Sequence, residues 1–487
     1  MRRVHLAGLC LAVIAHGTAR ASPGPVDWSA RLVEDARAIH DGIALNTPGP
    51  VDRWQPGFNA LSDAALALVR QRAARVHDEA GYVAALDAQI ASYNDGHVEL
   101  ALDLPPLPAR WPGFLVGERG DGVWRVLTRA ADAPVGTGAV LRACDGVPAA
   151  TLAERNVAPF VGRWQLATAR IFRGGRLLLD RGNPFIARPV DCVFDEAGLE
   201  RSVHLHWRDL PASEIDRRLA ETAPRAHPPI GSHVLADGTR WFNLSHFEAD
   251  PGTPVGRALV ALIAQMTRDR AAIRAAPAVV LDLRGNDGGS SDWSDQIADV
   301  LWGRAANAAF DRSGASILTE WRVSPANQAL LDADEKMLSS APGASATDRA
   351  LVASIAAGMK AAAGRGVSLW REPDTAPAAP EAVTEPTPRA VIYVLTDFLC
   401  QSACLDAVDR WRGLGAVQIG QQTGGDTYDL DARVDPLPSG AGTLYSPMKV
   451  YRNRPRGWNV PVTPTYLYPG DMRDTAALEA WVAALPR

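Results

Sequence analysis

The chain has 487 residues, of which 47% are hydrophobic and 22% are charged, and its formal net charge is −5. This length exceeds one ordinary hydrophobic core, so we expect two or three domains in a protein whose composition is that of a soluble globular chain. Because the net charge is small and no run of like charges occurs, neither a nucleic acid nor an anionic membrane surface is indicated as a partner.

Residues 1–21 have the pattern of a secretory signal peptide. Arg2 and Arg3 form a basic start, residues 6–15 form an apolar core, and residues 19–21 form a small-residue cleavage site. The apolar core is shorter than the roughly 20 residues that a spanning helix needs. We therefore expect a periplasmic or secreted mature chain that begins near Ser22 and has no membrane contact beyond its signal. An uncleaved membrane anchor is the alternative.

Residues 22–104 are predicted to form a helical N-terminal domain. Apolar residues recur three and four positions apart between residues 28 and 90, and prolines and glycines at residues 48–56 separate the first helix from the second. The domain ends in the turn Asn94-Asp-Gly-His97.

Residues 105–212 change to short runs that are typical of strands, such as residues 122–127 and 203–207. Between these runs, residues 135–148 resemble the part of a PDZ-like domain in which a strand ends in D-G-x-P. Such domains bind extended peptide ends at an open sheet edge. A small β barrel that spaces the other domains is the alternative.

Residues 228–487 are predicted to form an α/β layer with a mainly parallel sheet, because strand-like runs alternate with helical stretches. The strands are residues 240–244 and 278–283, and the helices are residues 254–275 and 293–302. An alanine-rich helical insertion is expected at residues 325–368, and a Pro/Ala/Glu linker at residues 373–388. Asp429, Asp431 and Asp435 alternate enough to suggest a cation site, but their spacing lacks the calcium-loop pattern, so a solvated strand face is expected.

Four cysteines remain after the signal, in a compartment that permits disulfides. Cys144 and Cys192 fall in the predicted β domain and could pair. Cys400 and Cys404 lie one helical turn apart. A bridge between them would strain a regular helix, and two buried thiols are the alternative.

Two turns that come after apolar strands carry groups suited to acyl transfer. In residues 391–406 an apolar strand ends and Ser402 begins a predicted helix, whose free N–H groups could stabilise an oxyanion. The run 278–283 leads to a turn whose glycines allow backbone amides to approach a ligand closely. His97 supplies a base, which a serine hydroxyl needs at neutral pH.

Four short motifs, in chain order, resemble those of the tail-specific, or carboxyl-terminal processing, serine peptidases. They are Asp95-Gly-His97, Asp282-Leu-Arg-Gly-Asn-Asp-Gly-Gly289, Ser402-Ala-Cys404 and Gly420-Gln-Gln-Thr-Gly-Gly425. The processing branch of that family uses a lysine after the serine as its base, whereas this chain has Gly424-Gly-Asp-Thr-Tyr428 there. The resemblance is therefore to the tricorn-like Ser/His branch. It implies an α/β fold with a helical N-terminal domain, a PDZ-like β domain and a C-terminal ClpP/crotonase-like core.

The resemblance also implies roles for single residues. Ser402 would be the nucleophile and His97 the general base, with His246 as the next candidate base. The N–H groups of Gly288 and Ala403 would form the oxyanion hole.

The residue that orients His97 is open. The glutamate that the tricorn-like branch uses has no counterpart in residues 454–464, and Gly96 stands where that branch has a serine. Asn459 and Asp95 are the candidates, since an asparagine can hold an imidazole tautomer in some cysteine peptidases.

The sequence thus predicts a secreted or periplasmic serine endopeptidase that acts on polypeptides presented by its PDZ-like domain. No metal and no organic cofactor is expected, because neither a zinc-binding H-E-x-x-H nor a Walker loop is present. A catalytically silent peptide- or ligand-binding protein on the same scaffold is one alternative. An esterase or other acyl transferase is another.

Overall fold

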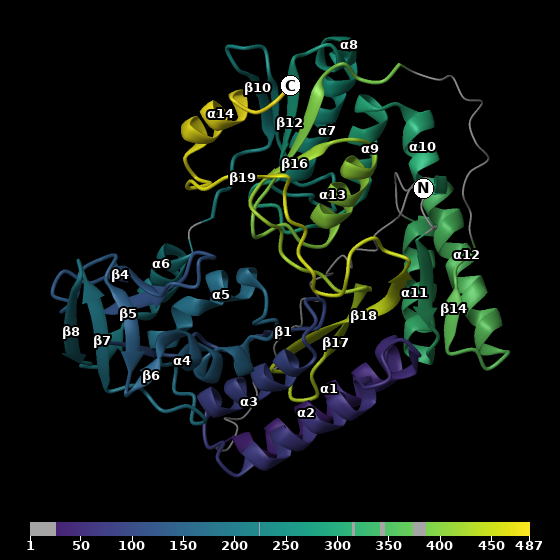
Figure 1. The fold of residues 1–487 in the computed structure, drawn as a ribbon. Helices are drawn as coiled ribbons and strands as arrows, with labels where there is room; N and C mark the ends of the chain where they lie inside the picture. The colour runs from purple at the N-terminus through teal and green to yellow at the C-terminus, as the bar shows by residue number, and fades with distance from the viewer. Residues whose placement is uncertain (1–25, 224, 314–316, 341–345, 374–385) are drawn as a thin grey trace.

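A computed structural model describes residues 26–223, 225–313, 317–340, 346–373 and 386–487 (Figure 1). The predicted signal peptide, residues 1–21, and most of the predicted linker lie outside the described residues. Within these ranges, every helix is too short or too polar to cross a bilayer.

The C-terminal half is built on a six-stranded, mainly parallel sheet, as the alternating pattern predicts. Its strands, in spatial order, are β10 (Gly231–Val234), β11 (Arg240–Asn243), β12 (Ala278–Asp282), β15 (Val391–Thr396), β16 (Val417–Gly420) and β19 (Tyr466–Leu467). Only the β10–β11 pairing is antiparallel among these neighbours. All five residues of β12 are buried, which explains why its sequence is continuously apolar rather than alternating.

Helices cover both faces of this sheet. Figure 1 shows α7 (Pro254–Arg268), α9 (Asp292–Leu301) and α13 (Ala403–Gly413) on one side and α14 (Thr475–Ala483) on the other. Successive strand residues face opposite layers: Val279 and Leu281 pack with the first three helices, and Val280 packs with α14. Two further helices, α8 (Arg270–Arg274) and α10 (Arg304–Ser313), complete the layer.

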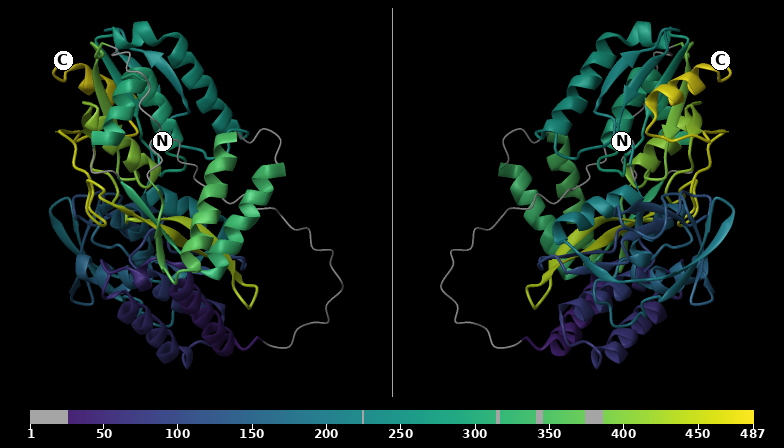
Figure 2. Two further views of the ribbon diagram at one scale, coloured as in Figure 1. Left: turned by 90° about the vertical axis from the view of Figure 1, so that its right-hand side faces the viewer. Right: turned by 90° about the vertical axis from the view of Figure 1, so that its left-hand side faces the viewer.

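Three helices form the N-terminal region: α1 (Trp28–Asn46), α2 (Phe58–Ala73) and α3 (Glu79–Ser92), with a 3₁₀ turn η1 (Gly49–Val51). The next strand along the chain, β1 (Glu99–Leu102), pairs antiparallel with β18 (Gly442–Arg452). Leu444 of β18 belongs to the same apolar cluster as the three helices, and both views of Figure 2 show β18 beside them. Residues before and after the central sheet therefore share one core.

The sheet that contains β18 has three further strands, and it carries the predicted insertion. These strands are β13 (Leu318–Arg322), β14 (Leu369–Arg371) and β17 (Asp429–Pro436). Between β13 and β14 lie α11 (Pro325–Ser340) and α12 (Ala346–Ala363). Trp321 of β13 and Met448 of β18 pack with these helices.

Residues 109–222 form a β-rich domain. Its main sheet has the strands β3 (Phe114–Gly117), β4 (Arg125–Arg129), β5 (Val140–Cys144), β7 (Asp191–Glu196) and β8 (Leu199–His204), with β6 (Val147–Pro148) beside β5. A two-stranded ladder joins β2 (Ala109–Trp111) to β9 (Arg208–Leu210). Helical segments are α4 (Ala149–Asn156), η2 (Ala158–Phe160), α5 (Ala167–Arg173), η3 (Gly174–Leu178) and α6 (Ala212–Thr222). A disulfide joins Cys144 to Cys192, which are register partners on β5 and β7.

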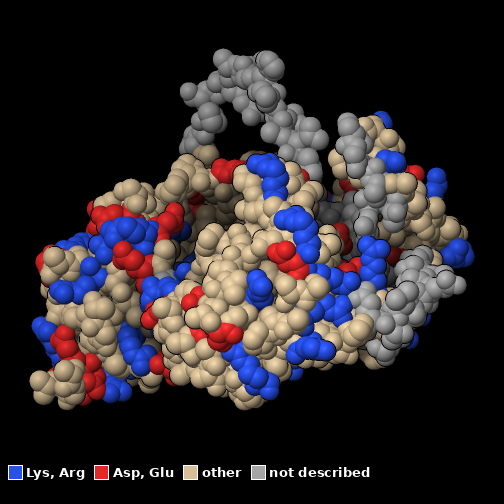
Figure 3. Space-filling view, turned by 90° about the horizontal axis from the view of Figure 1, so that it is seen from above, with Lys and Arg blue, Asp and Glu red and all other residues tan. Residues whose placement is uncertain are grey.

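The molecular surface carries charges of both signs. On the face seen in Figure 3, basic and acidic side chains are interspersed. This agrees with the small net charge of −5.

Candidate active site

Ser402 lies between β15 and α13 in a backbone conformation that is rare for a residue with a side chain. Its φ is +51° and its ψ is −127°. It occupies the N-cap position of α13, yet its hydroxyl does not hydrogen-bond to the first turn of that helix. A strained strand-to-helix turn is the arrangement that exposes a serine nucleophile in other hydrolases. The hydroxyl is thus not used as a helix cap.

A disulfide between Cys400 and Cys404 spans Ser402. The sequence suggested that this bridge would strain a regular helix, but α13 begins at Ala403, so Cys400 lies outside the helix. The chain can therefore close the bridge across the turn. Both cysteines are fully buried, so the turn that carries Ser402 is fixed on both sides.

The glycine turn after β12 packs directly against Ser402. A Cβ placed on Gly288 would lie 2.8 Å from Ser402 Cβ and 3.3 Å from the nitrogen of Ala403. Gly288 also has a φ of +121°, so both the conformation and the space require glycine.

The two predicted oxyanion donors differ in availability. The Ala403 N–H has no acceptor among the described residues. The Gly288 N–H donates to Oδ1 of Asn286 at 3.0 Å. To bind an oxyanion, the Gly288 N–H would have to donate to both acceptors at once or break its hydrogen bond to Asn286.

His97 presents Nδ1 to a group of buried acceptors. Its Nδ1 lies 3.4 Å from Thr427 Oγ1, 3.5 Å from Asp426 Oδ1 and 3.6 Å from Asp95 Oδ1. Asp95 also accepts the His97 backbone N–H at 2.8 Å and the Thr427 hydroxyl at 2.9 Å. Within the described part of the chain, Nε2 of His97 has no hydrogen-bond partner, so that nitrogen can face a substrate or nucleophile.

The charge state of His97 depends on these neighbours. Burial by itself lowers the pKa of an imidazole, but the carboxylates of Asp426 and Asp95 outweigh it and raise the pKa of His97 to about 9, against repulsion from Arg163. Burial raises the pKa of Asp426, against attraction from His97 and Arg456. At neutral pH the imidazole is therefore mainly protonated, and it must lose that proton before it can act as a base.

The two sequence candidates for orienting His97 have different positions. Asp95 lies near Nδ1 of the ring. Asn459 donates its side-chain amide to the carbonyl of Asn94 at 2.8 Å and its backbone N–H to the carbonyl of Asp426 at 2.7 Å. It thus ties together the backbone segments on either side of the imidazole rather than the ring itself.

Asp426 is the residue that sequence reasoning missed. It lies in the segment where the processing branch would have its lysine, and no recurring spacing connects it to His97. The one available signal was an aspartate in that otherwise uncharged segment, Gly424-Gly-Asp-Thr-Tyr428.

Arg163 joins the turns that carry the predicted residues. Its guanidinium donates to the Gln401 side chain and to the carbonyl of Gly425. A Cβ on Gly96 would lie 2.3 Å from the Arg163 guanidinium. The space beside Gly96 is therefore filled by an arginine, so a side chain at position 96 would have to displace it.

The turns converge on one cavity of about 480 Å³. Its walls include Asp95 and Gly96 from the histidine turn, Asp287 from the glycine turn and Gln401 from the serine turn. Asp287 holds His246, the second candidate base, with Nδ1 at 3.2 Å from the carboxylate. The segments that bear Ser402, His97 and Gly288, far apart in sequence, thus border the same space.

Comparisons with known proteins show the fold. No protein-family model and no curated protein matches the sequence. Mature CPAF matches in structure with a TM-score of 0.56 and 14% identity, over 90% of this chain and 93% of that one. A serine-to-alanine variant of CPAF matches with a TM-score of 0.58 and 13% identity, over 92% and 94%. The photosystem II D1 C-terminal processing protease matches with a TM-score of 0.35 and 12% identity, over 91% and 93%.

The chain therefore has the fold of the tail-specific proteases, a mixed α/β fold with a helical N-terminal region. The CPAF structures carry this conclusion, since they cover nearly the whole of both chains.

Proposed function

We propose that the protein is a tail-specific serine endopeptidase in which Ser402 is the nucleophile and His97 the general base. The observation that carries the proposal is the strained Ser402 turn packed against Gly288, with the His97 turn on the same cavity. The fold shared with CPAF adds support, because a protease scaffold is expected to place such turns together.

In the proposed reaction, His97 takes the Ser402 hydroxyl proton as the oxygen attacks the scissile carbonyl. The N–H of Ala403, together with that of Gly288 once Asn286 shares it, would hold the oxyanion. The imidazolium that forms would be stabilised by Asp426 and Asp95 and would then give its proton to the leaving amine. Water would release the acyl group by the same steps.

Two further parts of the proposal concern location and substrate. Residues 1–21 have the pattern of a signal, so we place the enzyme in the periplasm or outside the cell. The β-rich domain, with its proposed PDZ-like character, would present polypeptide ends to the cavity.

The test uses the chain without residues 1–21, an unfolded protein such as casein, and a fluorophosphonate probe. Wild type is expected to cleave casein and to take up the probe, and Ser402→Ala is expected to do neither. Ser339→Ala, an exposed position on α11, is the matched control and should behave as wild type. CPAF has been solved in a complex with lactacystin, so prior incubation with this compound should also reduce labelling.

Other outcomes select the alternatives. Labelling without casein cleavage would favour an esterase or a peptidase of narrow specificity. No labelling of folded wild type at pH 7 or pH 9 would contradict the proposal and favour a catalytically silent binding protein. The engaged Gly288 N–H is the observation that favours this second function.

A further inference from the structure

A buried carboxylate connects the two turns that carry the proposed oxyanion donors. Asp397 follows β15 and begins the serine turn, residues 397–402. Its Oδ2 accepts the Gly285 N–H of the glycine turn at 2.9 Å, and its Oδ1 accepts the Leu399 N–H of the serine turn at 2.9 Å. The Asp397 residue is only 6% exposed. One side chain that the proposed chemistry does not use therefore holds the backbone of both turns.

The hydrogen bond at Gly285 fixes the start of the turn that ends in Gly288. Gly285 precedes Asn286, whose Oδ1 accepts the Gly288 N–H at 3.0 Å and whose Nδ2 donates to the Leu244 carbonyl at 2.7 Å. Gly285 has a φ of +80°, and a Cβ there would lie 2.3 Å from the carbonyl oxygen of Ala226. This position therefore accepts only glycine, and its backbone is packed closely between two parts of the chain.

The charged neighbours of Asp397 leave both of its oxygens to these two amides. Arg284 donates to Asp282 through Nε at 3.0 Å and through its terminal nitrogen at 2.6 Å, so those two charges satisfy each other. Burial raises the pKa of Asp397 to about 6, against the N–H groups of Gly285 and Leu399. Asp282 adds to the rise in this pKa, and Arg284 opposes it. At pH 9 the group is a carboxylate that accepts on both oxygens.

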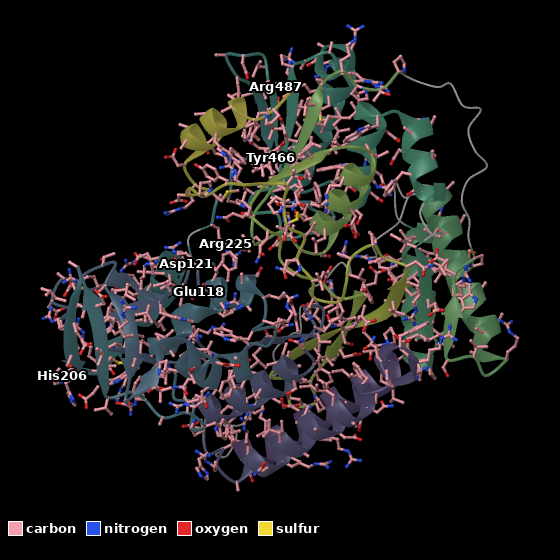
Figure 4. The ribbon with its side chains drawn as sticks, viewed as in Figure 1. Glu118, Asp121, His206, Arg225, Tyr466 and Arg487 are labelled. Atoms are coloured by element: carbon pink, nitrogen blue, oxygen red, sulfur yellow. A yellow bond between two sulfur atoms is a disulfide. The ribbon has the colours of Figure 1, made fainter. Side chains whose placement is uncertain are left out.

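The serine turn has a further anchor in the β-rich domain. The Thr168 hydroxyl donates to the Phe398 carbonyl at 2.6 Å, and a Cβ on Gly120 would lie 2.8 Å from the Phe398 ring. Glu118 holds the loop of Gly120 by accepting its N–H at 3.0 Å and that of Gly122 at 2.8 Å. Figure 4 labels Glu118 near the edge of the β-rich domain that faces the sheet domain. The serine turn thus keeps this anchor when the carboxylate is changed.

We propose that Asp397 is a positioning residue that sets the distance between the Gly288 and Ala403 amides, and thereby the fit of the oxyanion hole. The proposal rests on the proposed function, and it adds a residue that this function does not name. Asp397 would act through the two turns rather than by contact with the reacting atoms. Its bonds suit this role because N–H groups that donate to a carboxylate form stronger bonds than neutral pairs do.

The experiment compares wild type with Asp397→Asn at pH 9, using dye-quenched casein and the fluorophosphonate probe. Asparagine keeps the shape of the side chain, but its NH₂ group cannot accept, so one of the two hydrogen bonds is lost. We expect kcat to fall by about 10²-fold, the usual effect of a misplacement of about 1 Å. KM should stay near the wild-type value, because the oxyanion contacts form only in the transition state. Probe labelling should slow in parallel.

Asp237→Asn is the matched control. Asp237 is an exposed carboxylate that accepts the N–H of Thr239 at 2.9 Å, and it lies before β11, at the edge of the sheet opposite the two turns. The same change there should keep the wild-type kcat, KM and labelling rate. Thermal unfolding checks that each variant folds. If Asp397→Asn does not fold, Asp397→Glu, which keeps the charge and displaces it by one methylene, replaces it in the same assay.

The positioning role is refuted if the folded variant keeps the wild-type kcat, or if KM rises while kcat is unchanged. Failure of wild type to cleave and to label would instead refute the proposed function. Hydrogen exchange by mass spectrometry then compares Ser402→Ala with Ser402→Ala/Asp397→Asn. Faster exchange in residues 283–290 and in residues 397–403 of the double variant would support the connection between the turns without any catalysis. Unchanged exchange in either segment would refute the connection as well.

Discussion

The position of Asp426 beside His97 predicts a specific change in pH dependence. The pKa of His97 rises from its ordinary 6.5 to about 9, with Asp426 the strongest raising influence. At about 1.4 kcal/mol per pH unit, this difference corresponds to about 3 kcal/mol of stabilisation of the imidazolium, net of the cost of burial. Because the neutral imidazole is the base, wild-type kcat/KM should rise about tenfold per pH unit and level off near pH 9.

Asp426→Asn keeps the shape of the side chain and removes its charge. The midpoint of the kcat/KM profile should then fall by about 1 to 3 pH units, the usual effect of a close opposite charge. The plateau should also fall, by up to about 10⁴ as in a comparable triad, since the imidazolium that forms during attack loses its partner. Asp435→Asn, at a partly exposed position on β17 that pairs with Arg433, is the matched control.

The assay is peptide or ester hydrolysis from pH 5.5 to pH 10.5, with folding checked at each pH. A midpoint near pH 9 in wild type and a lower midpoint in Asp426→Asn support the reasoning. Identical midpoints in both proteins would refute the role of Asp426, and a wild-type midpoint near 6.5 would refute the raised pKa.

Three further predictions concern residues around the site. The pKa of His97 is raised to about 9 in the folded protein, so the protonated imidazole stabilises the fold below pH 6.5, and this stabilisation is lost as the pH rises through 9. In urea titrations, the difference in unfolding free energy between wild type and His97→Gln should therefore shrink by about 3 kcal/mol from pH 6 to pH 10. Replacing Cys400 and Cys404 by alanine should lower the unfolding free energy in urea by about 2 kcal/mol, a modest loss because the closed loop is short. The same change should slow fluorophosphonate labelling, because the bridge spans Ser402. Gly96→Ser should lower kcat/KM, because the Cβ of the new serine meets the Arg163 guanidinium. The double variant Gly96→Ser/Arg163→Ala should recover part of this loss.

The Cys144–Cys192 disulfide serves as a control for the Cys400–Cys404 disulfide. Cys144 and Cys192 close a longer loop, with a sequence separation of 48, so their removal should cost about 4 kcal/mol by the same chain-entropy model. They lie in the β-rich domain, away from the serine turn, and labelling of the folded variant should keep the wild-type rate. Equal slowing in both variants would show that the bridge at Ser402 has no specific effect on the turn.

The main features of the catalytic layer could be predicted because they depend on local pattern. A strand buried on both faces has a continuous apolar sequence, as in β12 and β15, and the turn after its carboxyl end lies at one edge of a parallel sheet. Ser402 and Gly288 both come after such strands. Their proximity is therefore a result of sheet order, which places β12 next to β15.

Other features depend on partners that are distant in sequence. Alternation correctly indicated a strand at Asp429 and Asp431, but the prediction of a solvated face was wrong. Asp429 is buried and accepts a hydrogen bond from Gln55, and Asp431 pairs with buried Lys449. An alternating sequence shows that the two faces of a strand differ in polarity. It does not show whether another part of the chain covers the polar face.

The same limit explains why Asp426 was missed. Asp426 contacts His97 across 329 positions of sequence, and no local pattern records that contact. Contacts between the β-rich domain and the serine turn are equally distant in sequence, as when the Thr168 hydroxyl donates to the Phe398 carbonyl at 2.6 Å.

The most direct test of the central claim is to identify the residue that a fluorophosphonate probe modifies. Wild type and His97→Ala, both without residues 1–21, would be labelled at pH 9, digested and mapped by mass spectrometry. The account predicts a single modified peptide, with the adduct on Ser402, in wild type and a much slower adduct at the same serine in His97→Ala. An adduct on another serine, or none in folded wild type, would contradict the assignment of Ser402 as the nucleophile.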